Sequence, residues 1–148
     1  MSNPYKLSLS VQYASNANIL PTRQQFRRWV NLALEQDVQI VLRIVDELEG
    51  RALNLSYRNK DYATNVLTFV YDDVNPLYGD VVICAPVVFR ESKEQSKDLL
   101  AHYAHLTVHA ALHLQGYDHD KRSDAEKMEA RETALMHKLR YPAPYLIR

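Results

Sequence analysis

The chain has 148 residues, which is the length of one ordinary domain. Hydrophobic residues make up 47% and charged residues 24%, a globular composition that excludes disordered and collagen-like chains. Lys plus Arg (18) balances Asp plus Glu (18), so any attraction for nucleic acid or an anionic membrane must come from a local patch. We expect residues 1–148 to form a single domain.

The chain shows no targeting or membrane-spanning pattern. Residues 1–20 lack the basic stretch, apolar run and cleavage site of a signal peptide. The most apolar stretch, residues 81–89, is interrupted by Pro86 and is far shorter than the roughly 18 residues of a membrane span. The single Cys84 cannot form an internal disulfide and lies among apolar neighbours, which indicates a buried, inert thiol in a reducing compartment. We expect a cytoplasmic protein without membrane contact.

The first part of the chain reads as a strand followed by a helix. Apolar and polar residues alternate over residues 5–13, which predicts a strand with one buried face. Thr22 and Gln25 have the spacing of a capping box. Apolar residues then recur every three or four positions, so an amphipathic helix is expected from Thr22 to about Gln36.

The middle of the chain is rich in β-branched residues. Residues 38–45 are largely apolar on both faces, which is typical of an interior strand. The polar segment 50–60 contains three spaced apolar residues and fits a short helix. Residues 66–71 and 80–84 are β-branched runs separated by a turn at residues 72–79, and they predict a hairpin.

From Ser92 onward the apolar pattern has the period of a helix. One long helix is expected from about residue 97 to 115, and another opens at Ser123, which forms a capping box with Glu126. Pro142 then ends the last helix. The elements together predict an α+β fold with about five helices packed around one mixed sheet of about four strands.

Five of the six histidines lie between residues 102 and 119. On a helix His109 and His113 are one turn apart, about 6 Å along the axis, and project to the same side. Gly116 can take a positive φ and end the helix, which lets His119 return to the same point. Metzincin proteases use this spacing to bind zinc through three histidines, with a position left open for water. The pattern therefore predicts one catalytic Zn²⁺ ion.

Two features of this motif limit the reactions that a bound metal ion could catalyse. Ala110 follows the first histidine, where zinc peptidases carry the Glu that acts as general base. Three neutral imidazoles also leave the full charge on the metal, which favours an anionic substrate such as a phosphodiester. A metallopeptidase-like hydrolase, a closed structural zinc site and ordinary helix histidines remain the alternatives.

Other polar residues near the motif are candidates for a supporting role. Asp118 and Asp120 flank His119, where they either orient water or an imidazole or act as solvated turn residues. His105 and His102 lie one to two turns before the motif on the same helical stripe. They either contact a ligand histidine or substrate, or are partly buried with one hydrogen bond.

The segment His-Ala-Ala-Leu-His-Leu-Gln-Gly-Tyr-Asp-His at 109–119 resembles the signature of the YbeY family of bacterial metal-dependent endoribonucleases. A second block agrees: residues 51–69 and the following Gly79 and Asp80 are similar to the family's other hallmark. Order and spacing match from about Asn54 to His119.

The resemblance implies a zinc ion at three histidines, a catalytic arginine and an RNA substrate. The zinc ligands would be His109, His113 and His119, and the arginine would be Arg58. The family acts on single-stranded RNA, in maturation of the 3′ end of small-subunit (16S) ribosomal RNA and in ribosome quality control. The expected partners are therefore RNA and the small ribosomal subunit, with no DNA. The alternative is a ribosome assembly factor without catalysis, whose metal site is structural.

Residues around Arg58 form the remaining candidate surface. Taken alone, Arg51, Arg58 and Lys60 fit the solvated face of a short helix. Beside a metal that attracts anions they form a candidate phosphate-binding patch, where Tyr57 or Tyr62 can stack on an unpaired base. The chain departs from the family pattern at four positions, none of them a metal ligand: Ala63, Asn65, Val70 and Ala110.

Overall fold

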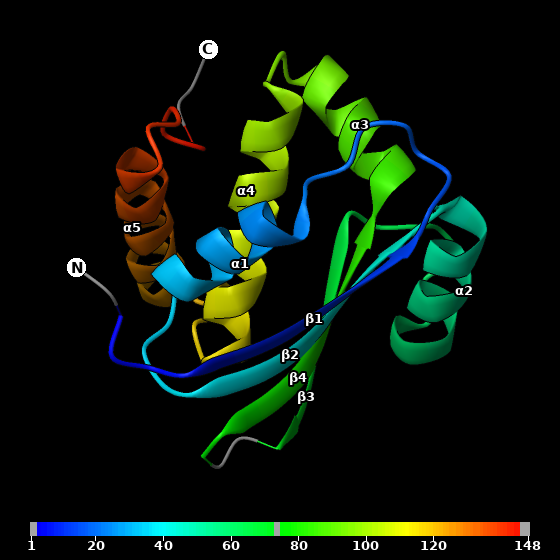
Figure 1. Ribbon diagram of the computed structural model, residues 1–148. Coiled ribbons are helices and arrows are strands. Elements are labelled where there is room, and N and C mark those ends of the chain that lie inside the picture. Colours follow the sequence, from blue (N-terminus) through cyan, green and yellow to red (C-terminus); the bar gives the residue numbers. More distant parts are fainter. Residues whose placement is uncertain (1–2, 73–74, 146–148) are drawn as a thin grey trace.

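The computed structural model describes residues 3–72 and 75–145 (Figure 1). Its strands form one sheet in the order β1-β2-β4-β3. The first three strands in this order are parallel, and β3 lies at the edge, antiparallel to β4. The bounds are β1 Leu7–Ala14, β2 Val38–Val45, β3 Val66–Asp72 and β4 Leu77–Cys84. The described helices are α1 Arg23–Leu32, α2 Glu47–Arg58, α3 Ala85–Glu94, α4 Leu99–Leu114 and α5 Arg122–Lys138. The predicted α+β class with a mixed four-stranded sheet is confirmed.

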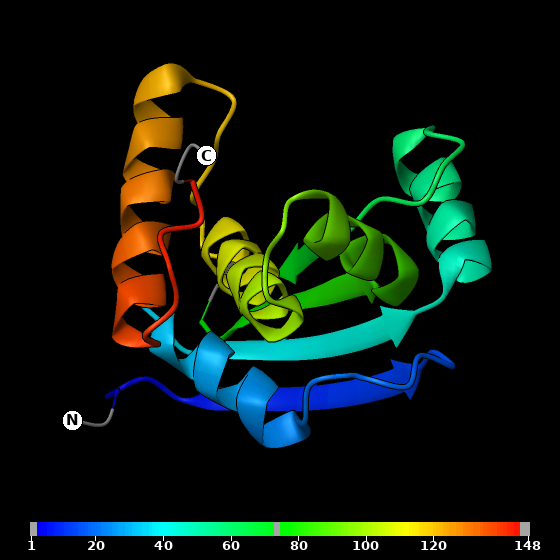
Figure 2. The same ribbon diagram turned by 90° about the horizontal axis from the view of Figure 1, so that it is seen from above.

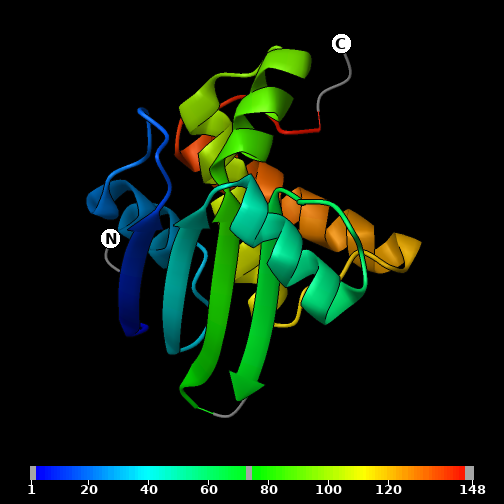
Figure 3. The ribbon, with the colours of Figure 1, turned by 90° about the vertical axis from the view of Figure 1, so that its right-hand side faces the viewer.

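The helices lie on both faces of the sheet. Seen from above, α4 lies between α5 and α3, and α1 packs beside it (Figure 2). The view in Figure 3 places α2 on the opposite face of the sheet from α4 and α5. The end of α2 is therefore separated from α4 by the edge strand β3, and this arrangement positions the site described below.

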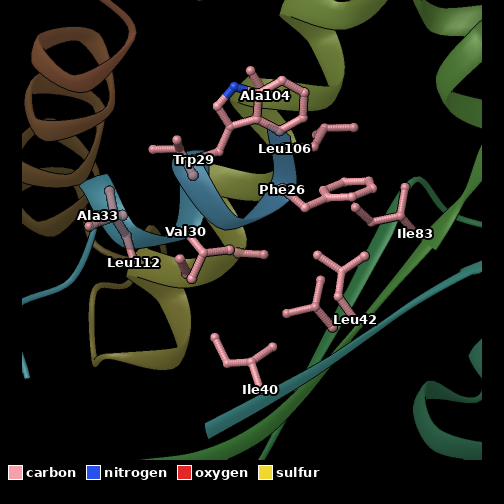
Figure 4. Packing of buried hydrophobic residues seen from close by; sticks show 14 of the residues in the cluster. Phe26, Trp29, Val30, Ala33, Ile40, Leu42, Ile83, Ala104, Leu106 and Leu112 are labelled. Atoms are coloured by element: carbon pink, nitrogen blue, oxygen red, sulfur yellow. The ribbon is translucent and has the colours of Figure 1, made fainter. Parts of the chain in front are cut away.

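The main core lies between α1, α4 and the sheet (Figure 4). Phe26 and Trp29 of α1 pack edge to face, with ring centroids 5.6 Å apart. They cover apolar strand residues such as Leu42 and Ile83, which are fully buried. Each such side chain contributes about 1.5–3 kcal/mol by leaving water. This packing holds α4 firmly against the sheet.

Helix α4 is buried along most of its length. From Ala101 to Leu114, His109 and His113 are the two residues that are not buried. At the carboxyl end of the helix, Leu114 lies over Gly79 of β4, where an added Cβ would come within 2.9 Å of it. The two half-buried positions of this stretch are therefore occupied by histidines.

Several predicted local features are confirmed. The Thr22 hydroxyl accepts a hydrogen bond from the Gln25 N–H, and the Gln25 side chain accepts one from the Thr22 N–H. Helix α1 itself is confirmed, but it is shorter than expected and ends at Leu32 rather than near residue 36. Cys84 is buried, and burial raises the pKa of its thiol. No helix within 3–72 or 75–145 is long and apolar enough to cross a membrane.

Other boundaries differ from those expected. The predicted capping box at Ser123 is wrong, because α5 starts at Arg122 and Ser123 lies inside its first turn. Strand β4 starts at Leu77, inside the predicted turn, of which residues 73 and 74 lie outside the described part. Helix α3 was not expected because Pro86 interrupts its apolar run. Pro86 lies in the first turn of α3, where a backbone N–H has no partner within the helix. Its missing N–H therefore costs no hydrogen bond.

Candidate metal centre and the groove around it

Helix α4 ends in a turn that reverses the chain. Gly116 has a φ of 106° and follows the C-cap residue. Its N–H donates to the His113 carbonyl, and the Tyr117 N–H donates to the Leu112 carbonyl, each at 3.1 Å. These two bonds form a Schellman motif, which requires a residue with positive φ at this position. The predicted role of Gly116 is confirmed, and the chain then turns back so that His119 faces the end of the helix.

The three histidine rings lie close together. The ring centroids are 6.4 Å apart for His109 and His113, 5.6 Å for His109 and His119, and 5.9 Å for His113 and His119. Because a zinc–nitrogen bond is about 2.1 Å long and zinc sites are tetrahedral, two imidazoles on one zinc ion have ring centroids about 5.3 Å apart. The three observed separations are larger than this by about 0.3–1.1 Å, and the ligand atoms of these histidines do not form a group within 4.8 Å. The structure therefore places the three rings near one another but does not show the tetrahedral arrangement of a zinc site.

Hydrogen bonds set the tautomers of the two helical histidines. His113 Nδ1 is 3.0 Å from the Tyr117 carbonyl oxygen, which can only accept, so this nitrogen carries the proton. His109 Nδ1 is 3.0 Å from Oε2 of Glu132 and donates to that carboxylate. Both Nε2 atoms therefore have a free lone pair. Metal-binding histidines in proteins donate from their other nitrogen in this way, so the donor set fits a bound cation.

A second group near the turn has closer ligand atoms. One ligand atom each from Asp118, His119 and Asp120 lies within 4.8 Å of the others, and all three residues are exposed. Asp118 Oδ1 accepts from the backbone N–H groups of His119 and Asp120, at 2.7 and 3.3 Å. The bond from His119 is the main cause that lowers the pKa of Asp118. These bonds support the interpretation of Asp118 as a turn residue. The three imidazoles remain the predicted metal site, and His119 belongs to both groups.

A groove of about 520 Å³ surrounds the histidines, and we call it the histidine groove. It runs from the three rings across the edge of β3 to the end of α2. Its lining residues are Tyr57, Arg58, Val66, Leu67, Thr68, Phe69, His109, His113, Asp118, His119 and Asp120. The structure thus places the predicted Arg58 on the wall of the same groove as the predicted metal ligands.

The basic residues of the predicted patch occupy different environments. Within the described part of the chain, the Arg58 side chain has no hydrogen-bond or ion-pair partner, and it is exposed. Arg51 instead pairs with Asp61 at 2.7 Å on the surface. Lys60 is exposed and does not line the histidine groove. Arg58 is therefore the member of the patch that is placed to meet an anion in the groove.

Of the two tyrosines considered for base stacking, one lines the groove. Tyr57 is 66% exposed, and its ring contacts Phe69 edge-on at a centroid distance of 5.0 Å. Tyr62 is also exposed but lies outside the groove lining. Tyr57 presents an aromatic surface beside Arg58.

Glu132 of α5 is a part of the site that the sequence did not predict. Its side chain is fully buried, and it accepts hydrogen bonds from His105, His109 and Tyr145. Burial acts to raise the pKa of Glu132, but these hydrogen bonds outweigh it and lower the pKa to about 2. One feature of the sequence could have revealed it: Glu132 is a charged residue on the apolar stripe of α5, four positions after Met128.

The two remaining candidate histidines each bind a carboxylate. His105 donates from Nε2 to Glu132 Oε1 at 2.5 Å, so it contacts the site through that carboxylate. Burial lowers the pKa of His105. His102 is buried, and its Nε2 lies 2.9 Å from Glu91, which also accepts from the Asn65 amide. The amide of Asn65 thus supplies a hydrogen-bond donor to Glu91.

Taken together, the fold and the site define an α+β protein with a three-histidine candidate metal centre in an open groove. Residues 6–140 match the profile of the family described as endoribonuclease YbeY. The endoribonuclease YbeY of Thiobacillus denitrificans is 58% identical over 142 residues, which cover 95% of this chain and 97% of that one. The endoribonuclease YbeY of Nitrosomonas eutropha is 55% identical over 139 residues, which cover 94% and 99%. The chain belongs to the endoribonuclease YbeY family.

A solved structure shows the same fold at lower sequence identity. The solution structure of TM1509 from Thermotoga maritima matches with a TM-score of 0.58 and 23% identity. The match covers 89% of this chain and 91% of the other. The arrangement of helices and strands is therefore shared.

Proposed function

We propose that this protein is a zinc-dependent endoribonuclease that hydrolyses phosphodiester bonds in single-stranded RNA. Its relatives bear the name endoribonuclease. The observation that carries the proposal is the position of Arg58, whose unpaired charge shares one groove with three converging imidazoles. Arg58 and a metal ion held by the imidazoles would both attract the phosphate of an RNA backbone.

The residues of the groove have separate tasks in this reaction. His109, His113 and His119 would hold one Zn²⁺ ion. Bound there, zinc supplies a Lewis acid that lowers the pKa of water and neutralises charge on a phosphoryl oxygen. Arg58 binds the phosphate and stabilises the charge that develops on it. Tyr57 stacks on a neighbouring unpaired base, which favours a single strand over a duplex.

The same proposal extends to the substrate in the cell. We infer that the protein acts in the cytoplasm on the 3′ end of 16S ribosomal RNA and in ribosome quality control, in contact with the small ribosomal subunit. Residues 1–148 act as one catalytic domain, because the groove combines the end of α2, the edge of β3 and the end of α4.

An assay with matched substrates tests the activity. Purified protein is incubated with a labelled single-stranded RNA, its duplex, a DNA strand of the same sequence and casein. We expect cleavage of the single-stranded RNA alone, loss of cleavage with a chelator and recovery on adding zinc. Cleavage that persists in the chelator, or cleavage of casein instead of RNA, contradicts the proposal.

A cellular experiment separates catalysis from a role in assembly. Cells that carry Arg58→Glu or His113→Ala should accumulate 16S RNA with an unprocessed 3′ end, as cells without the protein should. Normal processing in both variants, together with failure in cells that lack the protein, would instead identify an assembly factor with a structural metal site.

A further inference from the structure

Glu132 connects the candidate metal centre to the end of the described chain. Its Oε2 atom accepts from His109 Nδ1 at 3.0 Å. Its Oε1 atom accepts from His105 Nε2 at 2.5 Å and from the Tyr145 hydroxyl at 2.7 Å. Both oxygens of one buried carboxylate are therefore occupied by donors from α4 and from the segment after α5.

An ionised carboxylate only accepts hydrogen bonds, so its partners must donate. His109 therefore carries its proton on Nδ1 and keeps the Nε2 lone pair for a cation. A charged group that is buried is costly unless it is fully hydrogen-bonded. The bonds from His105 and Tyr145 meet this need, because they stabilise the charged carboxylate that His109 requires.

The segment 141–145 is held in place by several contacts. The Tyr141 N–H donates to the Met136 carbonyl at 3.0 Å, and Lys97 Nζ donates to the Pro144 carbonyl at 3.2 Å. The Tyr145 ring meets the His105 ring edge-on, with centroids 5.3 Å apart at an angle of 90°. These contacts direct the Tyr145 hydroxyl to Glu132.

We propose that Glu132 and Tyr145 are positioning residues of the metal centre. Tyr145 holds the Glu132 carboxylate, and that carboxylate fixes the ring and the tautomer of His109. The segment 141–145 is thereby a part of the metal centre, although it lies outside the histidine groove. The inference rests on the proposed function, because it requires a cation at the three histidines.

Two variants and one matched control test this inference. Tyr145→Phe removes one hydroxyl from an exposed residue. The control, Tyr141→Phe, makes the same change in the same segment, at a residue that is held by its backbone N–H, which donates to the Met136 carbonyl. Glu132→Gln keeps the size of the side chain, but its amide NH₂ must face one of the donors. Circular dichroism checks that each variant is folded.

The readouts are the zinc dissociation constant, from competition with a coloured chelator, and the visible absorption of the Co²⁺ form. Loss of a residue that orients a metal ligand lowers metal affinity about 10–100-fold. We expect about 10-fold weaker binding for Tyr145→Phe and about 100-fold for Glu132→Gln, with a changed Co²⁺ spectrum in both. Tyr141→Phe should bind as the wild type does.

The outcomes separate this inference from the proposed function. If the wild type does not bind zinc, or if His113→Ala binds it equally well, the proposed metal site is wrong. If His113→Ala loses zinc but folded Tyr145→Phe keeps the wild-type affinity and Co²⁺ spectrum, the positioning role is wrong. Weaker binding by Tyr145→Phe, with Tyr141→Phe unchanged, supports it.

Discussion

Replacing His113 by Ala should remove zinc binding while leaving the fold intact. His113 is half-buried, and its Nδ1 donates one hydrogen bond to the Tyr117 carbonyl. Loss of one hydrogen bond of this kind costs about 0.5–1.5 kcal/mol of folding free energy. The core between α1, α4 and the sheet does not include this side chain. The metal-free variant should therefore unfold only slightly below the metal-free wild type.

The effect on zinc binding should be much larger. Structural zinc sites with four ligands bind with about 10–16 kcal/mol, or about 2.5–4 kcal/mol per ligand. Loss of one ligand then weakens binding about 10²–10³-fold. At a zinc concentration 100 times the wild-type dissociation constant, the wild type gains about 2.7 kcal/mol of stability. A variant that binds 100-fold more weakly gains about 0.4 kcal/mol under the same conditions.

Thermal unfolding with and without zinc measures this difference. For a chain of this size 1 kcal/mol shifts the Tm by about 2–4 °C, so zinc should raise the Tm by about 5–11 °C in the wild type and about 1–2 °C in His113→Ala. His137→Ala is the matched control, because His137 is exposed on α5, and it should respond to zinc like the wild type. An equal zinc-dependent shift in His113→Ala would refute the three-histidine site.

Three further predictions concern other parts of the chain. Arg58→Ala should lower RNA cleavage about 100-fold and change the free energy of unfolding by less than about 0.5 kcal/mol, because the side chain is exposed; unchanged cleavage would remove Arg58 from the reaction. Gly116→Ala should destabilise the protein by about 1 kcal/mol through backbone strain at its positive φ, since an added Cβ meets nothing within 4 Å; urea unfolding measures this, and a neutral effect contradicts it. Burial acts to raise the pKa of Glu91, but hydrogen bonds from His102 and Asn65 outweigh it and lower the pKa below 4.5, so the carboxylate adds stability above about pH 4.5 that is lost as the pH falls. Glu91→Gln should therefore show less acid-induced loss of stability than the wild type, and identical pH profiles of urea unfolding would contradict the assignment.

Features that depend on neighbouring residues could be predicted from the sequence. The capping box at Thr22 and the positive φ at Gly116 follow from short-range hydrogen bonds and backbone sterics. The helical spacing of His109 and His113 likewise places both on one side of α4. The same kind of reasoning was wrong at Ser123, because a short capping motif also occurs inside a helix: α5 begins at Arg122 with Lys121 as its N-cap residue.

Contacts between residues far apart in the chain required the tertiary structure. Glu132 has no motif that marks it, and its role is visible only because α5 packs beside α4 and brings it to His109. Tyr145 reaches the same carboxylate from the end of the described chain. The family resemblance already implied Arg58, but only the tertiary structure shows that α2 ends at the rim of the groove and places this side chain in the same groove as the histidines.

The sequence alone determined the fold class and predicted the group of three histidines, because hydrophobic periodicity and helix geometry act over a few residues. Which groups surround those histidines was decided only by the tertiary structure. The burial of Glu132, the position of Arg58 and the return of Tyr145 each depend on how helices and strands pack. Packing follows from the combined burial of many apolar side chains, so no local pattern encodes it.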